Sequence, residues 1–440
     1  MVFDTILIGA GPCAVAALSA LPKGRKILVI SGAGGRLSAA HARFVHAKID
    51  SVARENGEDP GIAQRIKFAP PAKGELVRPA IVGGLANYWG QQFARYEAKD
   101  PWPRQTFGTH VQYLAACEEV EKLFYCSPDA ARSSAVTLDS GYSYRTPNLV
   151  LGSASDRSLG LLSMRNVFQS LAASHGATVV HLSAVRWELM RDSVRVFMSD
   201  GSCAEGRQLL LAAGVVGTLN LAFASCPEIA AATFGDHAPI MLFTTLKKSS
   251  LPTTRPDGVK HFNTLAIEKI LDDKIALFAS LYRLSHAPLS LLFAMLKLPA
   301  LSKGIKMPGL INLLTPIQLW TEATQFRYRL ERGSNSAFVD VPPAPGAEDA
   351  ELAAFLRWLK PRAKVWKISW ATPGGGFHFC AARLRLADGV EIPLSDHLHQ
   401  TQPGRVIVVD GASLAELGCR PSALTMMANS RQTVEHCQQS

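Results

Sequence analysis

TILIGAGPCAVAAL, residues 5–18, decides the fold expected for this chain. An apolar strand leads to an alanine-rich helix that reaches about Leu21, and the turn between them is Gly9-Ala10-Gly11-Pro12-Cys13-Ala14. The two glycines permit a tight turn and a close approach of the backbone, and Ala14 takes the helix-packing position. A strand, a glycine turn and a helix in this order predict a site for the pyrophosphate of a dinucleotide.

KILVISGAGGR, residues 26–36, continues this unit. Its apolar residues 27–30 predict a second strand, which completes a βαβ unit. A dinucleotide-binding fold normally carries an acidic residue at the end of this strand for the ribose hydroxyls, but this chain has Ser31, which forms a weaker hydrogen bond. Because Arg36 follows closely, Ser31 also fits a 2′-phosphate site. These residues leave FAD and NADP open.

The composition describes a large folded protein. The 440 residues are 48% hydrophobic and 19% charged, which argues against disorder and suits two domains, or one domain with an inserted lobe. Lysine and arginine exceed aspartate and glutamate by 46 to 36, and the net charge of +10 favours an anionic ligand or an anionic membrane surface. No run of basic residues interleaves with aromatics, so nucleic acid is not an expected partner.

Cysteine and histidine usage points to a reducing compartment and to no metal site. The eight cysteines are scattered without a CxxC pair, which predicts mostly buried free thiols in the cytoplasm. No signal peptide is expected, because Asp4 interrupts the N-terminus, and no apolar stretch is long enough for a spanning helix. His397 and His399 alternate on an expected strand, but two ligands without a third do not make a metal site.

Later segments have the alternation of apolar strands and helices that is typical of a nucleotide-binding domain. The expected elements are a helix at 163–175, a strand at 177–182, a hairpin through 184–200 that turns at Asp200-Gly201, a strand at 207–214, a strand at 405–413 and a helix from about Pro421. Residues 240–375 have a different, loop-rich and apolar texture, which predicts an inserted lobe that supplies the substrate pocket. The nucleotide domain is therefore expected to be discontinuous in sequence.

The apolar stretch 288–320 is open to two interpretations. Its leucines, with Lys297, Lys303 and Lys306 between prolines, suit a patch that dips into a membrane leaflet and admits a lipophilic substrate. The alternative is a buried core of the lobe or a contact between subunits. The oligomeric state cannot be predicted from these residues.

Six further segments follow the glycine turn: VGGLANYWGQQFARY (82–96), DPWP (100–103), LLLAAGVVGTLNL (209–221), FGDH (234–237), GGGFHFCAARL (374–384) and VVDGASLAELGCRPSALTMMANS (408–430). In this order they resemble the signatures of the glucose–methanol–choline family of FAD oxidoreductases, and the resemblance covers most of the chain. We interpret the chain as a short, divergent bacterial member of that family.

The resemblance implies an α/β fold: a Rossmann-like FAD-binding domain with an inserted α+β substrate domain. The discontinuous FAD-binding domain is expected at residues 1–100, 150–239 and 380–440. The substrate or cap domain is expected at 101–149 and 240–379.

The resemblance also resolves the choice of nucleotide in favour of FAD, with the adenosine half over the glycine turn and Ser31. The residues expected to bind it are Gly9, Gly11, Pro12, Cys13, Ala14, Ser31, Gly83, Gly84, Asn87, Trp89, Val185, Ala213, Gly214, Asp410, Gly411, Ala412, Pro421 and Ser422. The helix after Pro421 would direct its amides at the flavin and stabilise the negative charge of the reduced ring.

The family pattern makes His378 the base that takes the hydroxyl proton of an alcohol as hydride leaves for the flavin. The family also has a histidine or asparagine just before its C-terminal proline, but here Arg420 precedes Pro421. Arg420 is therefore the second catalytic candidate, for an alkoxide, a carboxylate or the reduced flavin. His237 matches a family position that is often structural.

The expected activity is FAD-dependent oxidation of a small-molecule alcohol to an aldehyde or ketone. The inserted lobe has few polar side chains for sugar hydroxyls, which favours a lipophilic or heteroaromatic alcohol. Two alternatives remain open. The missing second histidine or asparagine suits a redox-neutral or non-catalytic flavoprotein, whereas Ser31 and Arg36 suit an NADP-dependent reductase.

Overall fold

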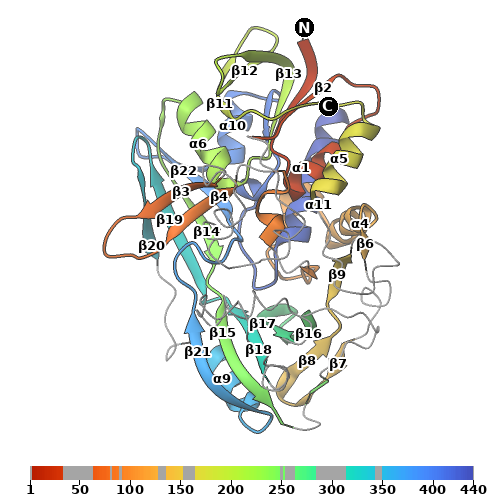
Figure 1. The fold of residues 1–440 in the computed structure, drawn as a ribbon, viewed down its shortest axis with the longest axis vertical. Coiled ribbons are helices and arrows are strands. Elements are labelled where there is room, and N and C mark those ends of the chain that lie inside the picture. Colours follow the sequence, from red (N-terminus) through yellow and green to blue (C-terminus); the bar gives the residue numbers. More distant parts are fainter. Residues whose placement is uncertain are drawn as a thin grey trace, which may run out of the picture.

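The structure is a computed structural model that describes residues 2–32, 63–79, 82–88, 92–126, 135–151, 164–247, 251–252, 263–283, 314–341 and 349–439. Its elements form an elongated molecule with both chain ends in the upper half and a separate sheet at the lower end (Figure 1). Three large sheets, which we call the nucleotide sheet, the middle sheet and the cap sheet, organise the described residues.

The nucleotide sheet contains the strands that the sequence predicts. Its order is β10-β2-β1-β13-β12-β11, and β24 pairs in parallel with the end of β13. The bounds are β1 (Val2–Ile8), β2 (Ile27–Ile30), β10 (Thr178–Val180), β11 (Ala184–Leu189), β12 (Val194–Met198), β13 (Cys203–Leu211) and β24 (Val406–Val408). The predicted hairpin needs one correction: β12 and β13 flank Asp200-Gly201, and β11 already turns back after Leu189.

Helices cover both faces of this sheet, so its central strands are buried on both sides and read as continuous apolar runs. One face, through Leu7, packs against α1 (Pro12–Ala20), α4 (His110–Glu121), α5 (Met164–Ser174) and α11 (Ala423–Gln439). The other face, through Ile6 and Ile8, packs against α6 (Val215–Ser225), α10 (Leu394–Thr401) and the middle sheet.

The middle sheet has the order β23-β22-β14-β19-β20-β3-β4. Its strands are β3 (Ala63–Phe68), β4 (Glu75–Pro79), β14 (Ile229–His237), β19 (Gln325–Glu331), β20 (Ser336–Val341), β22 (Cys380–Leu386) and β23 (Glu391–Pro393). Residues 325–341, which the sequence assigned to the cap domain, thus lie beside β14 and β3 instead, because β19 pairs with β14 along its whole length.

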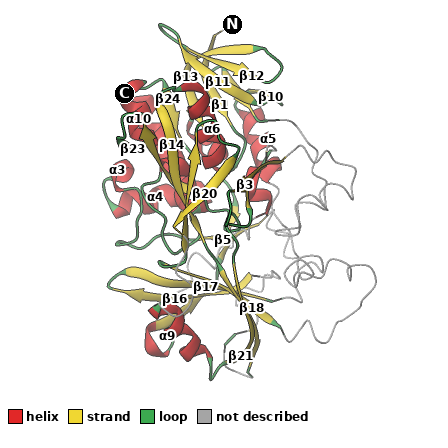
Figure 2. Cartoon of the chain, turned by 90° about the vertical axis from the view of Figure 1, so that its left-hand side faces the viewer, coloured by secondary structure: helices red, strands yellow, loops and turns green. Residues whose placement is uncertain are grey.

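The cap sheet, in the order β21-β15-β18-β17-β16-β8-β7, lies at the lower end of the molecule with α9 (Ala350–Leu359) against one face (Figure 2). Its strands are β7 (Val136–Thr137), β8 (Tyr142–Arg145), β15 (Ile240–Leu246), β16 (Asn263–Leu271), β17 (Lys274–Tyr282), β18 (Thr315–Thr321) and β21 (Ala363–Trp370). Leu352, Phe355 and Leu359 of α9 pack onto it and make a separate core.

Three connections carry the chain between the middle and cap sheets. β14 leads into β15, β18 leads into β19, and β21 leads into β22. Backbone hydrogen bonds join the three connections: Ala238 donates to Thr324 over 2.8 Å and Ala371 donates to Pro239 over 3.1 Å. The two sheets therefore meet at one seam, which carries both His237 and His378.

The structure bears on two further predictions: the strand expected at His397 and His399, and the apolar stretch 288–320. His397 and His399 lie on α10 and not on a strand, and His397 is buried with Nε2 2.9 Å from Glu228. Of the apolar stretch 288–320, residues 288–313 lie outside the described residues. Residues 315–320 belong to β18, an interior strand of the cap sheet.

Most cysteines whose side chains the structure describes are buried free thiols, as predicted. Within the described ranges, no helix is both long and apolar enough to cross a bilayer.

Candidate active site

A cavity lies where the nucleotide sheet, the middle sheet and the cap sheet meet. Its wall contains the ends of β1, β2 and β13, the start of α6, the loop 376–379 and residues of the cap strands β17 and β18. The carboxyl ends of parallel strands are where open α/β sheets place their ligands. The location therefore makes the cavity the candidate active site.

The glycine turn forms one wall of the cavity. Gly9 has φ of 119°, and a Cβ there would lie 2.0 Å from the carbonyl oxygen of Ala212, so only glycine fits. A Cβ on Gly11 would meet nothing within 4 Å among the described residues, and Gly11 lines the cavity. Helix α1 begins here with Pro12, without a capping hydrogen bond from any described side chain and without an acidic residue in its first turn. Its first amides are thus suited to an anion in the cavity.

The segment 82–88 lies against this turn. The Gly83 amide donates to the Ala10 carbonyl over 2.8 Å, and a Cβ on Gly84 would be 3.8 Å from the Gly11 Cα. Gly84 lines the cavity. The family signature quoted from these residues therefore meets the glycine turn in space.

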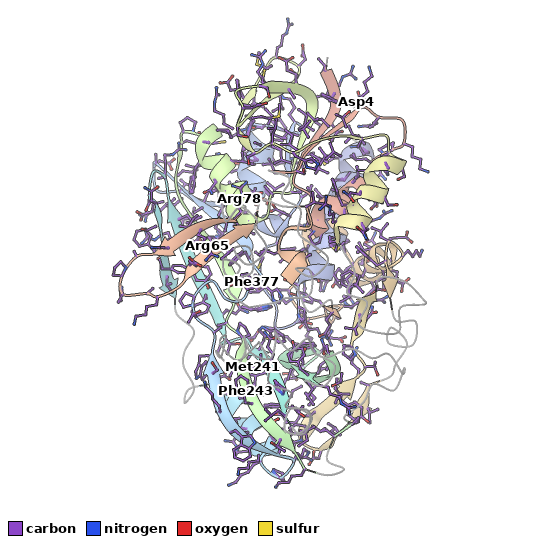
Figure 3. The ribbon with its side chains drawn as sticks, in the orientation of Figure 1. Asp4, Arg65, Arg78, Met241, Phe243 and Phe377 are labelled. Atoms are coloured by element: carbon purple, nitrogen blue, oxygen red, sulfur yellow. The ribbon has the colours of Figure 1, made fainter. Side chains whose placement is uncertain are left out.

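Arg78 is a cavity residue that the sequence analysis missed. It extends from β4 toward the start of α6, where a Cβ on Gly217 would lie 2.8 Å from the arginine Nε (Figure 3). Burial lowers the pKa of its guanidinium. It places positive charge in the wall that also contains the glycine turn. A single arginine in a short strand has no sequence pattern that marks it.

Ser31 lies at the end of β2 and lines the cavity, at the position that the sequence predicted. Its hydroxyl donates to the Val180 carbonyl over 3.3 Å and lies 2.8 Å from His181 Nδ1. The missing carboxylate is thus replaced by a serine held to the end of β10 and to His181. Arg36, on which the NADP alternative depends, lies outside the described residues.

Asp410 ties two turns of the cavity wall together. It accepts hydrogen bonds from the Thr218 hydroxyl of α6 over 2.6 Å and from the Ala412 amide over 2.9 Å. Burial raises the pKa of the Asp410 carboxyl to about 6. A Cβ on Gly411 would lie 2.5 Å from the Phe379 carbonyl oxygen, which explains the glycine after the aspartate.

The cavity brings most of the predicted cofactor residues together. Those that line it are Gly9, Gly11, Pro12, Cys13, Ser31, Gly84, Ala213, Gly214, Asp410, Gly411, Pro421 and Ser422. Ala14, Gly83 and Ala412 are buried behind the wall, and Val185 is 49% exposed beside the lining residue Ala184. Trp89 and the side chain of Asn87 lie outside what the structure describes.

His378 lines the same cavity and has a second histidine beside it. Its Nδ1 is 2.5 Å from Nδ1 of His237, and the two rings meet edge to face with centroids 4.8 Å apart. Asp236 accepts from the backbone amides of His378 over 2.8 Å and Gly376 over 3.2 Å. The end of β14 thereby holds both the backbone and the ring of His378.

Burial gives Asp236 and His237 unusual protonation. It raises the pKa of the Asp236 carboxyl to about 7 and lowers the pKa of the His237 imidazole to about 4. A Cβ on Gly376 would lie 2.0 Å from the His237 carbonyl oxygen, so the approach of the two segments requires glycine at this position.

Arg420 does not line the cavity, although the sequence made it a catalytic candidate. Its guanidinium is 2.9 Å from Glu268 and 3.0 Å from Glu97, and it also donates to the Arg95 carbonyl. The side chains of Arg420 and Glu268 are both 3% exposed. The structure thus gives Arg420 an ion-pairing role between α11 and the cap sheet.

The cap side of the cavity is more polar than the composition of the inserted lobe suggested. The lining residues there include Gln92, Asn263, Tyr282, Gln318 and Trp320. Gln92 Oε1 accepts from the Asn263 amide over 2.8 Å and from the Ser280 hydroxyl over 3.0 Å. Gln318 Oε1 accepts from the Tyr282 hydroxyl over 2.6 Å.

No family model and no curated protein sequence matches this chain. Solved structures do. Pyridoxine 4-oxidase from Mesorbium loti superposes with a TM-score of 0.60 at 13% identity, over 100% of this chain and 99% of its own. Formate oxidase from Aspergillus oryzae RIB40, solved as an arginine-to-lysine variant to study FAD modification, superposes with a TM-score of 0.62 at 10% identity, over 99% and 98%.

These enzymes are oxidases of the glucose–methanol–choline family. The likeness extends over both halves of the chain, so the α/β fold that the sequence resemblance implied is confirmed.

Proposed function

We propose that the cavity binds FAD and that the protein oxidises a primary or secondary CH–OH group to a carbonyl. The observation that carries this proposal is the convergence of two features on one cavity. The uncapped start of α1, with the open Cα of Gly11, suits a pyrophosphate, and His378 supplies a base in the same space.

The residues present fit FAD. Gly9, Gly11 and the first amides of α1 would hold the pyrophosphate, and Arg78 would add positive charge to that wall. At the end of β2, Ser31 offers a hydroxyl where the usual acidic residue would offer a carboxylate. Gly411, Pro421 and Ser422 supply the wall near His378, where the start of α11 suits negative charge.

FAD would supply the acceptor for the hydride that leaves the substrate carbon. His378 takes the proton of the substrate hydroxyl as the carbonyl forms, which a neutral imidazole can do near pH 7. The contact with buried His237 and the backbone hydrogen bonds that Asp236 accepts keep the base in place. Residues of the cap sheet form part of the cavity wall and would limit the access of water to the reacting groups.

The cap wall favours a heteroaromatic alcohol among the substrates that the sequence left open. The oxygens of Gln92 and Gln318 are already acceptors, so their amide groups can only donate to a ligand. Trp320 Nε1 is buried and has no acceptor among the described residues. A substrate ring with acceptor atoms would satisfy these donors, whereas an aliphatic chain would leave them unsatisfied.

The absorbance spectrum of the purified protein, after reconstitution with FAD, tests the cofactor. Flavin bands that remain through desalting are expected. Anaerobic titration with hydroxymethylpyridines, benzyl alcohols, long-chain alcohols and sugars then tests the reaction, and bleaching by the first group at the lowest concentration is expected. A protein that retains no flavin would overturn the proposal.

Two other functions are outcomes of the same titration. Tight FAD binding without bleaching by any alcohol would support a redox-neutral or non-catalytic flavoprotein. Reduction of the bound flavin by NADPH would support an NADP-dependent reductase.

A cytoplasmic location and contact with the inner membrane surface through 288–320 stay predictions. The net charge of +10 supports an anionic surface. Co-sedimentation with anionic liposomes checks the contact, and it should be lost on Leu291→Asp with Leu292→Asp.

A further inference from the structure

We infer that His237 is a positioning residue that fixes the tautomer of His378, so that His378 carries its proton on Nδ1 and its lone pair on Nε2. The consequence for catalysis rests on the proposed function, but the tautomer itself does not.

The assignment begins at Gly418. Its carbonyl oxygen is 2.5 Å from His237 Nε2, and a carbonyl oxygen can only accept a hydrogen bond. His237 therefore carries a proton on Nε2. Gly418 is itself held, because its amide lies 3.3 Å from the Tyr96 hydroxyl.

His237 is the neutral form with its lone pair on Nδ1. The side chain is fully buried, and desolvation lowers the pKa of the imidazole to about 4. Asp236, the neighbouring carboxyl, has its oxygens directed to the amides of the His378 loop and to the Tyr328 hydroxyl. A second proton on His237 is thus disfavoured near pH 7.

The proton between the two rings then belongs to His378. His237 Nδ1 has only a lone pair to offer across the 2.5 Å contact, so His378 Nδ1 is the donor. A neutral His378 with a proton on Nδ1 has its lone pair on Nε2, the nitrogen that a general base uses to take a proton. The chain of hydrogen bonds runs from His378 through His237 to a backbone carbonyl that cannot titrate.

Aromatic packing and backbone hydrogen bonds surround the two rings. Trp320 packs at 6.0 Å from the His237 ring and 6.3 Å from the His378 ring, measured between centroids. The two hydrogen bonds that Asp236 accepts hold the backbone of 376–378. If the His378 ring flipped while this backbone stayed in place, its short contact with His237 would be lost.

Nitrogen NMR on the protein labelled with ¹⁵N-histidine tests the tautomer directly. Protonated and unprotonated ring nitrogens are well separated in ¹⁵N shift, and the variants below assign the signals. At neutral pH, His378 is expected to show a protonated Nδ1 and an unprotonated Nε2, and His237 the reverse. A protonated Nε2 on His378 would overturn the inference. Because this measurement needs no turnover, it remains decisive if the proposed function fails.

Two variants of His237 separate positioning from packing. In His237→Asn, the side-chain oxygen can accept from His378 Nδ1, so the Nδ1-protonated tautomer should persist. In His237→Leu no acceptor remains, so the His378 signal should move toward a mixture of tautomers. In the FAD-loaded protein, the rate of flavin reduction by substrate should fall about 10- to 100-fold in His237→Leu, the size of one lost hydrogen bond, with most of it restored in His237→Asn.

His397→Asn is the matched control. His397 lies in α10, and like His237 it is buried and forms a hydrogen bond, in this case with Glu228. It should leave the His378 signals and the reduction rate unchanged. Equal losses of rate in His237→Asn and His237→Leu, with wild-type ¹⁵N signals of His378 in both, would contradict positioning and indicate packing alone. If His237→Leu does not fold, the wild-type tautomer and the Asn variant still decide the question.

Discussion

His378 is the residue on which the proposed chemistry depends. Its ring lines the cavity beside the seam between the middle and cap sheets, and the glycine turn that would hold FAD is on another wall. The roles of base and cofactor binding should therefore separate. We expect His378→Asn to retain FAD but to lower the rate of flavin reduction by substrate about 10²–10⁴-fold, the usual range for a positioned base. Stopped-flow absorbance under anaerobic conditions measures this. A wild-type rate in the variant would place the base elsewhere.

Arg78 and His237 have roles that their own positions in the sequence do not predict. Each becomes informative only through its neighbours in space: Arg78 through Gly217 of α6, and His237 through His378. In the sequence, one is an isolated arginine and the other belongs to the FGDH segment, at a family position that is often structural.

The β1–α1 connection contains two glycines with different roles. Gly9 is needed for folding, and Gly11 is needed for the ligand. Gly9→Ala should lower the free energy of unfolding by several kcal/mol or prevent folding, because its Cβ would overlap the Ala212 carbonyl at a positive φ. Gly11→Ala should leave the protein without FAD as stable as wild type, because its Cβ enters open space, but should weaken FAD binding. Urea unfolding and flavin fluorescence titration measure the two effects. A similar loss of stability in both variants would contradict this distinction.

The end of β14 carries two buried groups with opposite pH dependence. Burial raises the pKa of Asp236 to about 7, so the stability that its carboxyl contributes is present at low pH and is lost as the pH rises from 3.8 toward 7. Burial lowers the pKa of His237 to about 4, so its contribution is present above 6.5 and is lost as the pH falls toward 4. Between about pH 4 and 6.5 the two trends oppose each other.

Removal of His237 should therefore expose the trend of Asp236. In His237→Asn, the free energy of unfolding is expected to fall relative to wild type by about 1 kcal/mol per pH unit as the pH rises from 4 toward 6.5. Urea unfolding at several pH values measures the slope. Parallel curves for the two proteins would show that His237 does not titrate differently in the folded state.

At the scale of the whole molecule, an ion cluster around the buried Arg420–Glu268 pair joins the nucleotide half to the cap sheet. Arg420, just before α11, contacts Glu268 of β16, and Arg145 of β8 lies 2.8 Å from the same carboxylate. Glu97 completes the cluster at 3.0 Å from Arg420. Breaking the Arg420–Glu268 pair is unfavourable, because the buried Glu268 then keeps only the partly exposed Arg145 as its partner.

Arg420→Ala should accordingly lower the free energy of unfolding by about 3–5 kcal/mol. Lys122→Ala, which removes an exposed pair with Glu119, should change it by less than about 1 kcal/mol and serves as the control. Urea unfolding compares the two. Wild-type stability of Arg420→Ala, together with a loss of flavin reduction by substrate, would instead support the catalytic role that its position before Pro421 suggested.

The sequence by itself determined the local parts of this protein. The βαβ unit, the glycine turn, the strand before Gly214 and the helix after Pro421 follow from apolar runs and from glycine and proline positions, which act between near neighbours in the chain. The family resemblance also predicted that His378 stands beside the cofactor, and the structure places His378 in the cavity wall.

Only the tertiary structure decided which distant residues meet. His237 and His378 are 141 positions apart, and their contact exists because β14 and β22 pair in the middle sheet. The pairing of β19 with β14 took residues 325–341 out of the expected cap, and Arg420 pairs with Glu268 in the interior and not with the residues that line the cavity. Such contacts depend on the pairing of strands from separate parts of the chain, and local periodicity carries no information about which strands pair.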